Sequence, residues 1–170
     1  MFVGSIMASE TTAAAAGAVG VVRRDPMAML PFCGYNMGDY WKHWIEIGES
    51  LDEDKAPKIF NVNWFRKDDE GNFLWPGFGD NLRVLDWIID RCDGKVDAQE
   101  TAIGYLPYAK DINLEGLDMT EADLDKILDV DKDAWKKEYE GVEELYAKFG
   151  DRLPAELAAE LENAKKSLED

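Results

Sequence analysis

Residues 63–81 most constrain the fold, because a charged turn separates two groups of aromatic residues in the stretch NWFRKDDEGNFLWPGFGDN. Acidic residues, Gly and Asn in the DDEGN turn favour a reversal of the chain. The run KIFNVNWF at 58–65 has the β-branched and aromatic content of a strand, and FLW at 73–75 can return beside it. The segment therefore predicts an aromatic hairpin.

The flat side chains of this hairpin have two interpretations. Aromatic faces on a rigid support can stack on a planar heterocycle, which is worth about 1–3 kcal/mol per base. Gly77 and Gly79 flank Phe78, so the backbone can approach a ligand closely there, and Asn81 offers a donor and an acceptor to the edge of a base. The alternative is an aromatic mini-core in which Asn81 serves as a helix cap.

Composition limits the partners of the chain. Its 170 residues are 46% hydrophobic, which suits one packed domain or a piece of a larger one. A formal net charge of -17 argues against binding to nucleic acid or to anionic membranes. A phosphate ligand would need a local cationic site, because the overall field repels it. We interpret the acidic C-terminal third as a solvated helix face, with an acidic partner-binding tail as the alternative.

The residues alone do not assemble a complete active site. The sequence contains no GxxxxGK[ST] loop, no GxGxxG pattern and no Cys/His pair that would suggest a nucleophile. Cys33 and Cys92 are far apart and are interpreted as buried thiols in a reducing cytosol, with one disulfide as the alternative. His43 is the single histidine, which makes a zinc site improbable. We therefore expect no catalytic residue and no metal ligand in this chain.

The N-terminal segment does not resemble a targeting signal. Residues 1–22 contain no Lys or Arg, unlike secretory and mitochondrial signals, and no run is long enough to span a bilayer. We therefore expect a cytoplasmic protein without membrane contact. Ala and Gly dominate residues 13–20, which are interpreted either as a frayed linker or as a mobile lid with small side chains.

The remaining pattern predicts an α/β (mixed α+β) chain with a helical C-terminal tail. The N-terminal apolar run is strand-like, and Pro26 and Pro31 bracket an extended, buried connection. The elements expected beyond these are a helix at 37–49, a helix that Asp80 or Asn81 caps and Gly94 ends, a strand at 101–107, a helix with a capping arrangement of Thr120 and Asp123, and further helices to the C-terminus.

Long motifs in this chain resemble a known family. The stretch FLWPGFGDN, preceded by VNWFRKDDEG, is similar to the guanine-binding segment of GTP-dependent phosphoenolpyruvate carboxykinase, in a bacterial style. SETTAAAAG followed by RRDPMAMLPFCGYNMGDYWKHW resembles the mobile lid of that family and the segment after it. The resemblance is dense from Phe2 to Leu117 and looser in the helical tail.

The resemblance implies roles for particular residues. The rings of Phe65 and Phe78 would sandwich guanine, and the ring of Phe73 would close the pocket. The stretch from Phe78 to Asn81 would bind the nucleotide with backbone and side chains, and Asn81 would contact the guanine edge. The full set of expected guanine-site residues is Phe65, Phe73, Phe78, Gly79, Asp80 and Asn81. The expected lid residues are Thr11, Thr12, Ala13, Ala14, Ala15, Ala16 and Gly17.

The resemblance also implies a reaction for the family. Oxaloacetate and GTP give phosphoenolpyruvate, GDP and CO2 in gluconeogenesis, with manganese and with magnesium on the nucleotide. We expect residues 1–117 to hold the lid and guanine site, and residues 118–170 to form C-terminal helices of the same domain. The metal ligands and phosphate loop would lie in a missing N-terminal part, so the chain alone would be inactive and the complete enzyme monomeric. The alternative is a non-catalytic guanine-nucleotide-binding remnant, or a subunit that needs a separate N-terminal chain.

Overall fold

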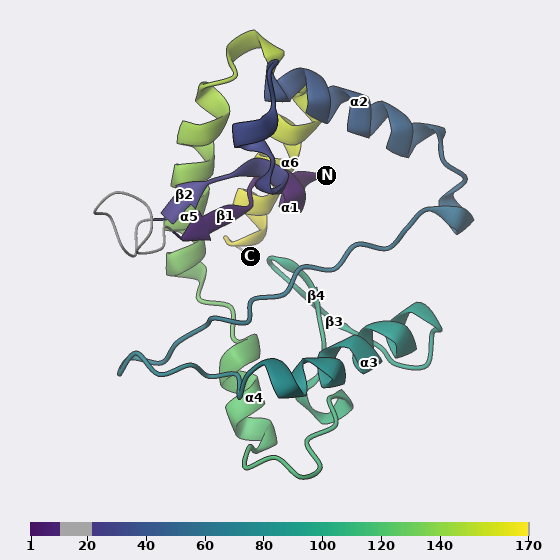
Figure 1. Cartoon of the computed structure of the whole chain (residues 1–170), viewed down its shortest axis with the longest axis vertical. Helices are drawn as coiled ribbons and strands as arrows, with labels where there is room; N and C mark the ends of the chain where they lie inside the picture. Colours follow the sequence, from purple (N-terminus) through teal and green to yellow (C-terminus); the bar gives the residue numbers. More distant parts are fainter. Residues whose placement is uncertain (11–21, 170) are drawn as a thin grey trace. The chain divides into compact units, whose positions relative to one another are not determined.

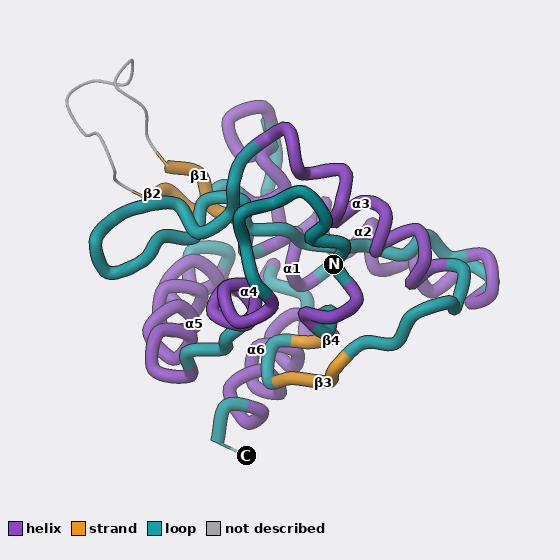
Figure 2. The backbone as a smooth tube through the Cα atoms, turned by 90° about the horizontal axis from the view of Figure 1, so that it is seen from below, coloured by secondary structure: helices purple, strands orange, loops and turns teal. Residues whose placement is uncertain are grey.

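The computed structural model describes residues 1–10 and 22–169, which form helices and two pairs of antiparallel strands (Figure 1). Figure 2 shows how helices and loops outweigh the short strands. This mixture confirms the predicted mixed α+β class. The helices are α1 (Phe2–Ser5), α2 (Met37–Ser50), α3 (Asn81–Cys92), α4 (Glu121–Leu128), α5 (Lys132–Ala147) and α6 (Ala155–Ser167). The strands are β1 (Ala8–Glu10), β2 (Val22–Arg24), β3 (Gln99–Thr101) and β4 (Gly104–Leu106).

The described residues fall into two compact units. The first contains Met1–Ala56 and Lys132–Asp170, and the second contains Pro57–Asp131. The first unit thus joins the two ends of the chain, and the whole aromatic segment 63–81 lies in the second. The expected division at residue 117 concerns functional roles within one domain and stays a prediction.

The core of the first unit forms where α1, α2, α5 and α6 meet. Trp41 of α2 is fully buried, and its ring packs edge-on against Tyr146 and Phe149 at centroid distances of 5.8 Å and 4.6 Å. Leu157 and Leu161 of α6 are buried as well. Their spacing of four residues places both on one helix face, as the helical pattern predicts.

The strand pair β1–β2 is held to α5 within the same unit. Its register pairs Ala8 with Arg24, and the Arg24 guanidinium makes an ion pair with Glu138 of α5. A Cβ on Gly141 would lie 2.7 Å from the Arg24 guanidinium, so a larger residue here would require the end of the Arg24 side chain to shift.

The second unit has its own aromatic core. Trp75, Trp87, Ile112 and Leu124 are buried together, and partly buried apolar side chains pack around them. Helix α4 begins with the predicted capping box, in which Thr120 and Asp123 satisfy each other's backbone N–H groups. Strands β3 and β4 form a hairpin, so the strand expected at 101–107 is in fact the end of β3, a turn and β4.

Three further local predictions are wrong. The N-terminal run forms helix α1 rather than a strand at residues 2–5. Residues 58–65 form no strand, and the expected hairpin keeps only one isolated bridge, between Lys67 and Phe73. The connection between the two prolines is a pair of 3-10 turns at Pro26–Ala28 and Leu30–Phe32. Chain reversals at Asp25 and Asp68 supply local hydrogen bonds that extended backbone could not make alone.

The remaining global expectations concern thiols and membranes. Cys33 and Cys92 are both free thiols, but Cys92 is exposed and Cys33 half-buried, so the expectation of buried thiols is wrong. In the part of the chain that the structure describes, no helix combines the length and apolar character needed to cross a membrane.

Candidate functional site

The turn of the aromatic segment is held by Asp68. Its Oδ1 accepts hydrogen bonds from the backbone N–H groups of Glu70 and Asn72 at 3.0 Å and 2.8 Å, while its own N–H donates to the Asn72 carbonyl at 2.9 Å. The hydrogen bonds that the carboxylate accepts, first from the backbone and side chain of Asn72 and then from Glu70 and Gly71, lower the pKa of Asp68 below its ordinary value. Gly71 completes the turn with φ +86, a conformation that favours glycine. The turn is therefore a rigid support, as stacking requires.

Two tryptophans of this segment point into the protein. Trp75 is 6% exposed and belongs to the core of the second unit, and Trp64 packs against it at a centroid distance of 6.0 Å. Trp87 of α3 is buried in the same cluster. The mini-core interpretation therefore holds for the indole rings.

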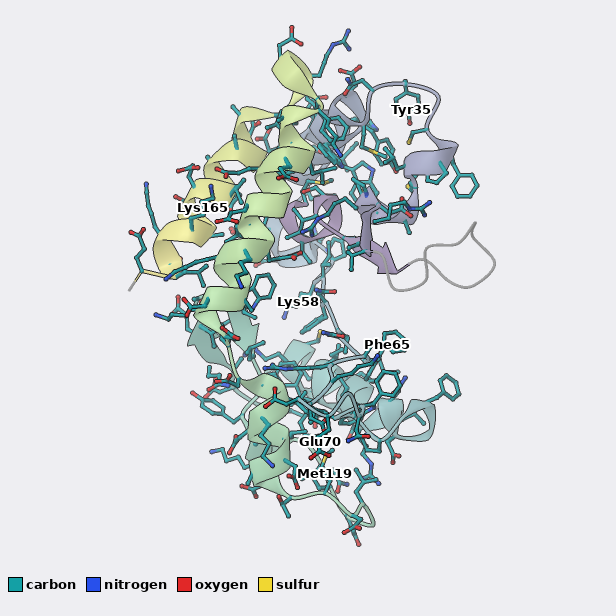
Figure 3. All side chains as sticks on the ribbon, turned by 90° about the vertical axis from the view of Figure 1, so that its left-hand side faces the viewer. Tyr35, Lys58, Phe65, Glu70, Met119 and Lys165 are labelled. Carbon is teal, nitrogen blue, oxygen red and sulfur yellow. The ribbon has the colours of Figure 1, made fainter. Side chains whose placement is uncertain are left out.

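Three phenylalanines of the same segment point outward. Phe65, Phe73 and Phe78 are 72%, 58% and 92% exposed. Phe65 and Phe73 touch edge to face at a centroid distance of 6.1 Å, and Figure 3 shows the labelled Phe65 side chain on the outside of its ribbon. Exposing three large rings in one short segment forgoes the free energy of burying them, which is about 1.5–3 kcal/mol for a Phe. Such a cluster is a candidate binding surface.

The two glycines around Phe78 differ in whether the structure requires glycine at their positions. Gly77 has φ +131, which side chains on an L-residue rarely allow. At Gly79 a Cβ would meet no described atom within 4 Å, so packing among the described residues does not require glycine there. A bare backbone at Gly79 leaves room for a ligand to approach beside the exposed Phe78 ring.

Asp80 and Asn81 stand at the start of α3, and each side chain has a defined partner. Asp80 makes no side-chain cap bond and instead accepts a hydrogen bond from Arg83 Nε at 3.1 Å. Asn81 is the first residue of α3, and its Oδ1 accepts a hydrogen bond from the Trp75 indole N–H at 2.9 Å. The capping role considered for these two side chains is therefore wrong.

Sequence reasoning did not identify two residues that contact expected site residues: Arg83, which bonds Asp80, and Lys67, which lies over Phe73. Arg83 also donates to the carbonyl oxygens of Asn113 and Glu115 at 2.7 Å and 2.9 Å, which ties the start of α3 to a distant loop. Lys67 Nζ lies 5.1 Å from the centre of the Phe73 ring, which places a positive charge beside the exposed aromatic cluster. Phe65 and Lys67 are two residues apart, so in an extended segment they would lie on the same side, and this spacing could have indicated Lys67. The carbonyl partners of Arg83 are 30 and 32 residues away, so no local pattern indicates them.

The remaining expected site residues lie elsewhere. Thr11, Thr12, Ala13, Ala14, Ala15, Ala16 and Gly17, the expected lid, lie outside the described residues. Within residues 1–10 and 22–169, no three His, Cys, Asp or Glu side chains gather as a metal site. The described residues therefore do not fit a manganese centre.

Known proteins similar to this chain agree on one family. The family model described as phosphoenolpyruvate carboxykinase C-terminal P-loop domain matches residues 1–167. Phosphoenolpyruvate carboxykinase [GTP] of Renibacterium salmoninarum is 56% identical over 168 residues, which is 99% of this chain and 28% of the relative. The enzymes of the same name from Arthrobacter sp. and Neocallimastix frontalis are 54% and 55% identical, over 100% and 99% of this chain and 28% of each relative.

The chain thus spans little more than a quarter of the length of the curated relatives that it matches. The match covers nearly all of the chain, including the aromatic segment and both compact units. The chain belongs to the GTP-dependent phosphoenolpyruvate carboxykinase family, in the part described as its C-terminal domain.

Proposed function

We propose that residues 63–81 bind the guanine of GTP or GDP. Phe65 and Phe78 stack on the two faces of the base, and Phe73 closes the side of the pocket. The backbone at Gly79 approaches the nucleotide, and the stretch Asp80–Asn81 lies at its edge. Family membership supports these roles, and so does the rigid turn held by Asp68.

One observation carries this proposal: in a single segment the Trp75 indole is buried and the Trp64 indole partly buried, while the three phenyl rings are exposed. A hydrophobic mini-core would bury both kinds of ring, because exposed apolar surface is costly. Phe78 is 92% exposed, between two glycines that keep the surrounding backbone bare. A planar base that stacked on these rings would remove from water the apolar surface that the fold leaves exposed.

Charge restricts how the rest of the nucleotide binds. The net charge of -17 repels polyphosphate, and Lys67 is the cation that the structure places against the aromatic cluster, over Phe73. A single exposed Lys cannot neutralise a triphosphate. We infer that the phosphate-binding groups belong to the part of the enzyme that this chain does not include.

In the complete enzyme, the proposed reaction converts oxaloacetate and GTP to phosphoenolpyruvate, GDP and CO2, in gluconeogenesis. Manganese, with magnesium on the nucleotide, would supply electrostatic stabilisation of the transferred phosphoryl group from ligands outside this chain. The contribution of this chain is to bind and orient the base. Positioning of this kind is a large share of catalysis in phosphoryl transfer.

Further proposals follow from the family. Thr11 to Gly17 serve as a lid that excludes water from the enolate, since a proton taken from water would divert it to pyruvate. Residues 1–117 carry lid and guanine site, and residues 118–170 the C-terminal helices of the same domain. An N-terminal part of the same enzyme completes the active site, and the enzyme is a cytoplasmic monomer.

Nuclear magnetic resonance (NMR) titration of the 170-residue chain with GDP and ADP tests the guanine site. We expect GDP to shift the ring resonances of Phe65, Phe73 and Phe78, and ADP to shift them far less. Phe78→Ala should weaken GDP binding roughly five- to 150-fold, which corresponds to the loss of about 1–3 kcal/mol of stacking.

A matched control variant is Phe32→Ala. Phe32 is 84% exposed and belongs to the first unit rather than to the aromatic segment, so its truncation removes a similarly accessible ring that is not part of the proposed site. This variant should bind GDP like the unmodified chain. Equal effects of the two substitutions, or equal shifts with GDP and ADP, would refute the proposed site.

A further inference from the structure

The side-chain amide of Asn81 is oriented by one hydrogen bond from the core. Its Oδ1 accepts the indole proton of Trp75 at 2.9 Å. An indole N–H is only ever a donor, so the oxygen of the amide, and not its nitrogen, must face Trp75. The amide NH2 of Asn81 therefore points away from the core. Asn81 itself is half-buried.

We propose that Trp75 is a positioning residue that fixes the Asn81 amide with its NH2 outward, so that the site reads a hydrogen-bond acceptor on the purine. The inference rests on the proposed guanine site. Guanine carries an acceptor oxygen at position 6, whereas adenine carries an amino donor there. The outward NH2 of Asn81 would meet the acceptor oxygen of guanine, but in adenine it would meet the amino group, which is also a donor.

The contrast with the other buried indoles shows that this bond is not a general feature of the core. Within the described residues, the indole N–H groups of Trp41 and Trp87 are buried without a hydrogen-bond partner. Trp75 and Trp87 share one cluster and are each 6% exposed, yet only Trp75 has an acceptor. If the Asn81 amide turned over, its NH2 would face the indole N–H and a buried donor would be left unpaired.

The backbone around this pair limits how else the amide could be placed. Asn81 is the first residue of α3, and Arg83, two residues further on, is bonded to the 113–115 loop. The start of the helix is thus fixed from outside, and the indole fixes the last torsion of the side chain. Discrimination between bases is strongest where such polar groups are pre-oriented and are left unpaired by the wrong ligand.

The first test compares Trp75→Phe with Trp87→Phe. Both substitutions trim an indole in the same cluster, but only the first removes the donor to Asn81. In Trp75→Phe we expect the ratio of the ADP dissociation constant to the GDP dissociation constant to decrease by about tenfold. NMR titration measures both constants. Trp87→Phe should leave this ratio unchanged, although it alters the same core.

A second readout needs no ligand. The order parameter of the Asn81 side-chain amide, from 15N relaxation, should be high in the unmodified chain, fall in Trp75→Phe and stay high in Trp87→Phe. An ordered amide in Trp75→Phe would overturn the positioning role. If the unmodified chain does not prefer GDP over ADP, the guanine site fails, and the order parameter still decides the role of Trp75.

A further variant, Asn81→Asp, covers the case in which Trp75→Phe does not fold. The carboxylate can still accept the indole proton of Trp75, but it has no outward donor. We expect the Trp75 indole proton to stay protected from exchange with solvent while the preference for GDP falls. A retained preference in Asn81→Asp would overturn the inference, because the outward NH2 would then not read the base.

Discussion

The two compact units use aromatic rings in different ways. In the first, Trp41, Tyr139 and Tyr146 are almost wholly buried, and Trp41 packs edge-on against Tyr146. In the second, Trp75 and Trp87 are buried while Phe78, three residues after Trp75, is 92% exposed. The first unit has exposed rings too, such as Phe32 at 84%, but the second unit divides its rings between core and surface within one short segment.

The difference shows that aromatic content alone does not locate a binding site. What separates the two uses is the local backbone, namely a rigid turn at Asp68 and bare glycines beside Phe78. In the first unit Trp41 and Tyr146 lie on helices that pack against one another, so these two rings are covered, whereas Phe32 in a 3-10 turn is exposed. Substitutions in the two units should therefore differ in their effect on stability.

The largest effect is expected for Trp41→Ala in the first unit. Trp41 is fully buried, so its truncation should lower the free energy of unfolding by about 3–5 kcal/mol, from lost burial and the cavity left behind. Urea denaturation followed by circular dichroism measures this. Phe78→Ala should stay within about 0.5 kcal/mol of the unmodified chain, as surface substitutions do. Similar losses in both variants would abolish the distinction between core and site rings.

Next in size is Gly38→Ala, compared with Gly48→Ala on the same helix, α2. A Cβ on the buried Gly38 would overlap the carbonyl oxygen of Arg152, whereas a Cβ on Gly48 meets no described atom within 4 Å. We expect Gly38→Ala to destabilise the first unit by about 1–3 kcal/mol. Gly48→Ala should stabilise it by about 0.5–1 kcal/mol, because alanine favours helices. Thermal or urea unfolding would show whether the two signs differ.

A smaller effect is expected at alkaline pH, in the first unit. Burial raises the pKa of the Tyr146 hydroxyl to about 12, from an ordinary value of 10.0. The fold therefore favours the neutral phenol, and this contribution is complete below pH 10 and is lost as the pH rises from about 10 to 12. Urea midpoints across that range measure it. Tyr146→Phe should remove this part of the pH dependence, and an unchanged profile would contradict the assignment.

The smallest effect is expected at acid pH, in the second unit. Hydrogen bonds from Lys126 and Thr120 lower the pKa of the Asp123 carboxyl to about 2, from an ordinary value of 3.8. The stabilisation of α4 is therefore present above about pH 4 and is lost as the pH falls towards 2. Amide exchange in α4 measures it. Asp123→Asn should flatten the response, and a response equal to that of the unmodified chain would contradict the role of the capping box.

Features that depend on neighbours along the chain could be predicted from the sequence. The helices at 37–50 and 81–92, the capping box of Thr120 and Asp123 and the reversal at Asp68 follow from periodicity and from side chains that bond to nearby backbone. The family could also be identified from the sequence, because long motifs such as FLWPGFGDN occur in the order in which the family has them.

Features that depend on distant partners emerged only with the tertiary structure. Residues 58–65 have strand composition, but a strand needs a partner along its length, and the bridge at Lys67 and Phe73 does not extend to it. Which rings of residues 63–81 are buried depends on Trp87, Ile112 and Leu124, which lie far along the sequence. The orientation of the Asn81 amide depends on the Trp75 indole, and that indole is fixed only because the core closes around it.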